Sequence, residues 1–134
     1  RYGASVRRLL AGDRRVRFHD DASPEDTLRA MSLADAVVVP SIWLETGPYT
    51  VLEAQWTGAT VIGTRLGGIA ERLDGQPAGF TFERGSAHDL ARAITSARSS
   101  GRSASARTES ARSFRAVYKA GFAAELDALL ARLA

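Results

Sequence analysis

The sequence of 134 residues contains no cysteine. This excludes disulfide bonds, cysteine nucleophiles and thiolate zinc sites, and it is typical of a reducing compartment. The chain also lacks an uninterrupted run of about 18 apolar residues, the length that a membrane-spanning helix requires. Its basic first residues have no apolar stretch of the kind found in a signal peptide. We therefore expect a cytoplasmic protein, with the inner face of the membrane as an alternative location.

Lysine is almost absent, because Lys119 is the only one among 18 basic residues, and the net charge is +3. The arginines are spread along the chain instead of forming one block, which argues against a nucleic-acid-binding protein. Asp20 and Asp21 are adjacent acids, but no third oxygen ligand lies at a fixed spacing from them, so we expect no metal. His88 is expected to be solvated, whereas His19, near a predicted strand end, could contact a ligand.

Alternating strand and helix patterns predict an α/β fold with a doubly wound parallel sheet. The apolar, β-branched runs at 36–40 and 59–64 are typical of strands buried on both faces, and the first of them is expected to be central. Weaker strands are predicted at 15–19 and 79–83. Helices are expected at 2–11, 23–33, 49–57, 69–73, 86–97 and 109–133, the last after a linker at 99–105.

The informative segment runs from residue 40 to residue 73. Glu45 lies in the loop after the predicted central strand, and Glu53 lies about one turn inside the next helix. The helix N-terminus between them offers free N–H groups and a positive dipole end, which suit a phosphate. A carboxylate is a strong acceptor for sugar hydroxyls. A sugar joined to a diphosphate has groups in this arrangement.

At this segment the sequence resembles the retaining glycosyltransferases of the GT-B fold, the group 1 (GT4-like) family. The resemblance covers about 16–97 and rests on five features in order and spacing. These are Ala34-Asp35 before the apolar strand and Ser41, the Glu-x7-Glu motif from Glu45 to Glu53, Ala54 after it, Gly58 before the next strand, and Gly67-Gly68-x-x-Glu71. The resemblance implies that residues 1–98 form part of a Rossmann-like nucleotide-sugar-binding domain, with the linker and an amphipathic helix at 99–134.

The resemblance also implies roles for single residues. Glu53 would hold the ribose hydroxyls, and Glu45 would contact the donor sugar and act in catalysis. The donor-binding set would be Glu45, Gly47, Pro48, Tyr49, Thr50, Val51 and Glu53, and Asp20, Asp21 and Ala22 would flank the base. The family usually has glycine at the position of Asp20, small or sulfur-containing residues at the positions of Gln55 and Trp56, and a commoner apolar residue at Tyr49.

The implied reaction is transfer of a sugar from a nucleoside diphosphate donor to an unidentified acceptor, with retention and without metal or cofactor. Alternatives are a nucleotide-sugar epimerase of the GT-B fold and a non-catalytic binding module. No cation occurs between Pro40 and Glu53. The family places its basic pair upstream and its acceptor site on a separate N-terminal domain, so we expect this chain to be a fragment that binds weakly and is inactive alone.

In the doubly wound order, two strands would normally lie between the strands predicted at 15–19 and 36–40. Without them, each strand exposes unpaired backbone groups. The sequence therefore predicts that these two strands either pair directly or pair with a second copy of the chain.

Overall fold

The computed structural model describes residues 2–101 and 103–133. Its centre is a parallel three-stranded sheet in the order β1-β2-β3. The strands are β1 (Ala36–Val39), β2 (Thr60–Thr64) and β3 (Gly79–Phe82). Every residue of β2 is buried. The predicted α/β class and parallel sheet are therefore confirmed, and within the described residues no helix is long and apolar enough to cross a membrane.

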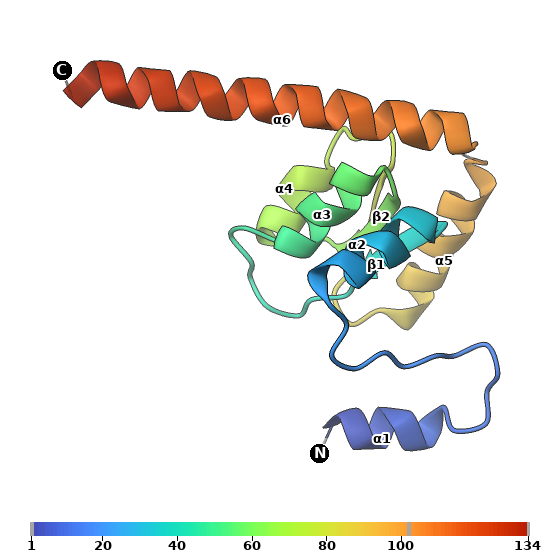
Figure 1. Ribbon diagram of the computed structural model, residues 1–134. Coiled ribbons are helices and arrows are strands. Elements are labelled where there is room, and N and C mark those ends of the chain that lie inside the picture. The colour runs from blue at the N-terminus through green and yellow to red at the C-terminus, as the bar shows by residue number, and fades with distance from the viewer. Residues whose placement is uncertain (1, 102, 134) are drawn as a thin grey trace.

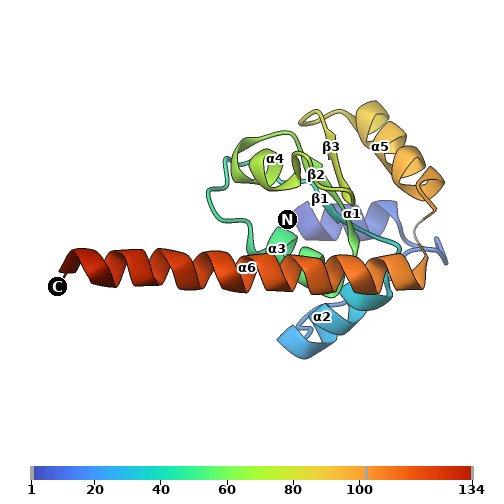
Figure 2. The ribbon, with the colours of Figure 1, turned by 90° about the horizontal axis from the view of Figure 1, so that it is seen from above.

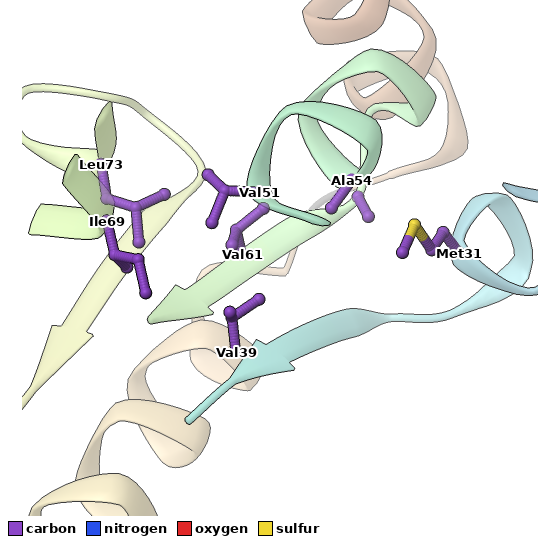
Figure 3. Packing of buried hydrophobic residues seen from close by; sticks show 8 residues of the cluster. Met31, Val39, Val51, Ala54, Val61, Ile69 and Leu73 are labelled. Carbon is purple, nitrogen blue, oxygen red and sulfur yellow. The ribbon is translucent and has the colours of Figure 1, made fainter. Parts of the chain in front are cut away.

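Helices cover both faces of the sheet (Figure 1). Helices α2 (Pro24–Leu33), α3 (Tyr49–Thr57) and α4 (Gly67–Leu73) lie on one face, and α5 (Ala87–Ser99) lies on the other. The first face holds the larger apolar cluster, to which α3 and α4 contribute branched side chains above the strands (Figure 3). Its members labelled in Figure 3 are Met31, Val39, Val51, Ala54, Val61, Ile69 and Leu73.

The boundaries of these helices follow from local chemistry. Ser23 caps α2 by accepting a hydrogen bond from the Asp26 N–H at 3.1 Å, and Pro24 fits its first turn. The Ser86 hydroxyl caps α5 in the same way through Asp89. The Glu83 N–H donates to the Asp89 carboxylate at 2.7 Å, and this bond, with help from Arg92, holds the pKa of Asp89 below its usual range. The residue that follows β3 is thereby tied to the first turn of α5.

Two strand predictions were wrong. Residues 15–19 form no strand, and the chain there is irregular. As a result β1 is not central: it lies at the edge of the sheet and pairs only with β2, which leaves Val38 38% exposed. The direct pairing of the segments 15–19 and 36–40 within one chain does not occur. Strand composition alone did not suffice at 15–19 because a short segment without a pairing partner gains no ladder hydrogen bonds.

The C-terminal helix α6 (Ala104–Leu133) starts earlier than expected, and the predicted linker at 99–105 shortens to the residues between α5 and α6. Its first half packs on α3, where the Arg115 Nε donates to the Trp56 carbonyl at 3.0 Å and the guanidinium lies over the indole. Its second half runs beyond the sheet (Figure 2). Of its apolar side chains, Phe114 is half-buried, but Val117 is 70% exposed.

The apolar side chains of α5 differ in burial. On α5, Ala93 is buried and Leu90 packs on the core, but Ile94 is 45% exposed because β1 beneath it has no further neighbour. The side chains of Tyr118, Phe122, Leu126, Leu129 and Leu130 lie outside the described residues. Helix α1 (Tyr2–Leu9) is shorter than predicted and stands away from the sheet in Figure 1.

Gly58 provides a test of how α6 is seated on α3. Its φ of 78° lies in the left-handed region, and a Cβ there would stand 2.2 Å from the Arg107 carbonyl oxygen. Gly58→Ala should therefore lower the free energy of unfolding by about 1 to 3 kcal/mol, measured by chemical denaturation. Gly75→Ala is the matched control, since Gly75 has a φ of 66° and no atom within 4 Å of the added methyl group. An equal loss in both variants would show that the α6 contact contributes nothing.

Candidate functional site

The candidate site lies where two parallel strands end. The loop 40–48 follows β1, and the turn at Gly67 follows β2. Because β1 and β2 are parallel neighbours, both connections emerge at the carboxyl edge of the sheet. The Thr64 hydroxyl donates to the Val39 carbonyl across the two strand ends at 3.4 Å. In open α/β sheets this edge is where ligands bind.

The loop is held in place by the start of α4. The Gly68 N–H donates a hydrogen bond to the Glu45 carbonyl oxygen at 2.8 Å. A Cβ at Gly68 would lie 2.7 Å from that same oxygen and 3.0 Å from the Thr46 carbonyl oxygen. Only glycine permits this approach without displacement of the loop. The glycine pair after β2 therefore fixes the backbone of Glu45, although the two residues are far apart in sequence.

Helix α3 begins directly after this loop without a side-chain cap. Pro48 is its N-cap residue and is buried, which fixes the direction in which the chain enters the helix. The Val51 N–H donates to the Pro48 carbonyl at 3.0 Å, and the Val51 side chain is buried in the core. The N–H groups of Tyr49 and Thr50 belong to the first turn, where no intrahelical acceptor exists. These two amides, with that of Gly47, are therefore free to meet an anion.

The two carboxylates of the motif differ in exposure. Glu45 is half-buried in the loop, and Glu53 is exposed on α3. Neither forms an ion pair within the described residues. Arg65, the first residue after β2, is paired instead with Glu83 at 2.9 Å. Both carboxylates therefore remain available as hydrogen-bond acceptors for a polar ligand.

The predicted base-flanking residues are less closely tied to this region. Asp20, Asp21 and Ala22 are exposed and precede α2. The Asp20 carboxylate is bound by Arg7 of α1, and Asp21 has a φ of 54°. Their role at the base stays a prediction. His19 and His88 are both exposed, and His19 does not end a strand. Within the described residues, no three histidine, aspartate or glutamate side chains are grouped to hold a metal ion.

The residues that depart from the family pattern on α3 differ in their surroundings. Gln55 donates through Nε2 to the Arg72 carbonyl of α4 at 3.3 Å, and Trp56 packs on Arg115 of α6. These two residues join α3 to its neighbouring helices. Tyr49, by contrast, is 79% exposed at the start of α3. It stands beside the free amides of the first turn.

The loop also carries an apolar rim that the sequence analysis did not single out. Ile42, Trp43 and Leu44 are 60%, 74% and 71% exposed immediately before Glu45. Three consecutive apolar residues between a predicted strand and a predicted helix could have indicated this rim from the sequence. Contiguous apolar patches on a protein surface often mark a binding site. The rim, defined as these three residues, borders the candidate site.

Comparison with known proteins identifies the family of this chain. The family model of group 1 glycosyl transferases matches residues 8–114, which include both glutamates, the first turn of α3 and the glycine pair. The chain belongs to this family. It is also similar to a D-inositol 3-phosphate glycosyltransferase of Corynebacterium efficiens, with 38% identity over 60 residues. That match covers 45% of this chain but only 14% of the relative.

The close contact at Gly68 can be tested directly. Gly68→Ala should push the Glu45 and Thr46 carbonyls away and destabilise the protein by about 1 to 3 kcal/mol, the usual cost of overpacking. Amide chemical shifts of residues 44–50 in NMR spectra should change together with the free energy of unfolding. Gly47→Ala serves as the control for the free energy of unfolding, since nothing lies within 4 Å of its added methyl group. If the amide chemical shifts of residues 44–50 were unchanged in Gly68→Ala, the contact between Gly68 and the Glu45 carbonyl would not position the loop.

Proposed function

We propose that this chain is the donor-binding part of a retaining glycosyltransferase that transfers a sugar from a nucleoside diphosphate to an acceptor. Membership of the group 1 family supports sugar transfer, and the site geometry supports the choice of donor. The observation that carries the proposal is the uncapped start of α3 flanked by two unpaired carboxylates, Glu45 and Glu53. The binding partner of this domain would be the N-terminal GT-B domain that supplies the acceptor site.

The diphosphate would bind at the first turn of α3. There the amides of Gly47, Tyr49 and Thr50 can donate to phosphate oxygens, and the positive end of the helix favours negative charge. As the donor breaks down, negative charge grows on the leaving diphosphate, so this stabilisation increases in the transition state. The structure offers no arginine or lysine in the loop 40–48 to assist. We infer that the required cations are contributed from outside this segment.

Glu53 would bind the ribose hydroxyls, and Glu45 would bind the donor sugar. Glu53 lies one turn into α3 and is exposed, so a ribose can reach it from solvent. Glu45 is half-buried and has its backbone fixed by Gly68, so it can hold a sugar in one orientation. Its negative charge also suits the positive charge that develops at the anomeric carbon in an oxocarbenium-like transition state. Retention follows if the acceptor attacks on the face from which the diphosphate leaves, with that phosphate accepting the proton.

The choice of donor can be tested by titrating the chain with UDP, GDP, ADP and dTDP in turn. One of them should perturb the NMR amide signals of residues 45–53 before those of any other segment. Failure of all four to bind, in this chain and in a form that includes the acceptor-binding domain, would favour a non-catalytic module. Recovery of an epimerised nucleotide sugar instead of a glycoside would identify an epimerase.

Glu53→Ala should weaken binding of the preferred nucleoside diphosphate by about 1 to 3 kcal/mol, because a charge-assisted hydrogen bond to the ribose is lost. Isothermal titration calorimetry measures this difference. Glu25→Ala removes an exposed acid from α2 and should leave the affinity unchanged. If the 2′-deoxy and 3′-deoxy nucleotides lose as much affinity for the wild-type protein as for Glu53→Ala, the assignment to ribose is wrong.

Glu45→Gln keeps the size of the side chain and removes its charge. In the catalytically complete enzyme it should lower kcat by more than it raises the donor Kd, since the carboxylate acts on charge that appears in the transition state. Steady-state rates of donor hydrolysis or transfer, combined with the measured Kd, separate the two effects. Equal losses in both quantities would identify Glu45 as a ground-state contact only.

A further inference from the structure

Only a small part of the surface of α3 is open to solvent. Of its 9 residues, Tyr49, Thr50 and Glu53 are exposed, and the others are half-buried or buried. Val51 and Ala54 belong to the larger apolar cluster above the sheet (Figure 3). These two buried side chains fix the rotation of the helix about its axis, so the open face is fixed as well. That face covers the first turn of α3 and the start of the second.

Tyr49 and Glu53 are neighbours on this open face. They are four residues apart, a spacing at which helical side chains lie one above the other with Cβ atoms about 5 to 6 Å apart. Helical side chains also lean toward the N-terminus, so the Glu53 carboxylate leans toward the turn that holds Tyr49. A group bound by Glu53 on this face therefore comes within reach of the Tyr49 ring.

The Tyr49 side chain has no structural partner within the described residues. It is 79% exposed, and neither a hydrogen bond nor a ring contact holds it there. Its hydroxyl is a neutral hydrogen-bond donor beside amides that have no intrahelical acceptor. The loop 40–48 before it contains no arginine or lysine. Tyr49 thus supplies a side-chain donor next to a segment that has no cation.

We propose that the side chain of Tyr49 binds the ribose and the adjoining phosphate of the donor. This inference rests on the proposed function, in which Glu53 binds the ribose hydroxyls and the amides of the first turn bind the diphosphate. Tyr49 lies one turn before Glu53, at the level of those amides. Its ring packs on the ribose, and its hydroxyl donates to the phosphate next to the ribose. An apolar residue, which is commoner in the family at this position, offers the packing without the hydrogen bond.

Tyr49→Phe removes only the hydroxyl group and tests the phosphate contact. The probes are whichever of UDP, GDP, ADP and dTDP binds best, with the corresponding nucleoside monophosphate and nucleoside. In NMR titrations, Tyr49→Phe should weaken binding of the diphosphate and the monophosphate by about tenfold, the loss expected for one hydrogen bond to a charged group. Its affinity for the nucleoside should equal that of the wild-type chain. Val117→Ala is the control, since Val117 is 70% exposed on α6, and it should leave all three affinities unchanged.

Nuclear Overhauser contacts test the packing of the ring. The ring protons of Tyr49, identified by their loss in Tyr49→Leu, should give cross-peaks to the ribose protons of the bound nucleotide. Absence of these cross-peaks would overturn the ribose contact, and an equal loss of affinity for the nucleoside in Tyr49→Phe would overturn the phosphate contact. So would a Tyr49→Phe affinity equal to that of the wild type for every probe.

These failures differ from a failure of the proposed function. If a nucleotide still perturbs the amide signals of residues 45–53, donor binding stands and only the role of the Tyr49 side chain is wrong. If none of the four nucleotides binds, in this chain or in a form that includes the acceptor-binding domain, both the inference and the proposed function fail.

Discussion

The candidate site depends on one contact, the hydrogen bond from the Gly68 N–H to the Glu45 carbonyl. It joins the loop after β1 to the first turn of α4, and the absence of a side chain at Gly68 allows the two backbones to approach. Without this contact, the loop 40–48 would be a surface connection with three exposed apolar side chains. With it, the loop delivers Glu45 and the start of α3 in a fixed relation to the ends of β1 and β2. The group 1 glycosyl transferase family, to which the chain belongs, connects this arrangement with sugar transfer.

The rigidity behind the site comes from the core cluster. Val51 and Ala54 are fully buried on the underside of α3, so the helix that presents Glu53 cannot rotate without exposing them. On its other side α3 is covered by α6, through Arg115 and the Trp56 carbonyl. The residues that differ from the usual family pattern at Gln55 and Trp56 therefore serve helix packing. Tyr49 is a further departure and is exposed beside the first turn of α3, as the rim of Ile42, Trp43 and Leu44 is exposed before Glu45.

Different contacts surround the two outer strands of the sheet. β3 ends in a network in which Arg65, Glu83 and Asp89 tie the strand to its neighbours. At the start of β1, the Arg107 guanidinium donates to the Ala34 carbonyl at 2.9 Å and lies 3.9 Å from the Asp35 carboxylate.

The sequence by itself determined the parallel α/β order, the exact span of α3 and its end at Gly58, because caps, apolar runs and glycine conformations act within a few residues. It also located Glu45 and Glu53 around a helix start, and the family to which that motif belongs. Only the tertiary structure decided that residues 15–19 remain unpaired and that β1 is an edge, since strands exist through partners that local composition does not supply. Likewise, the Gly68 contact with the Glu45 carbonyl joins segments that meet only when the sheet has formed.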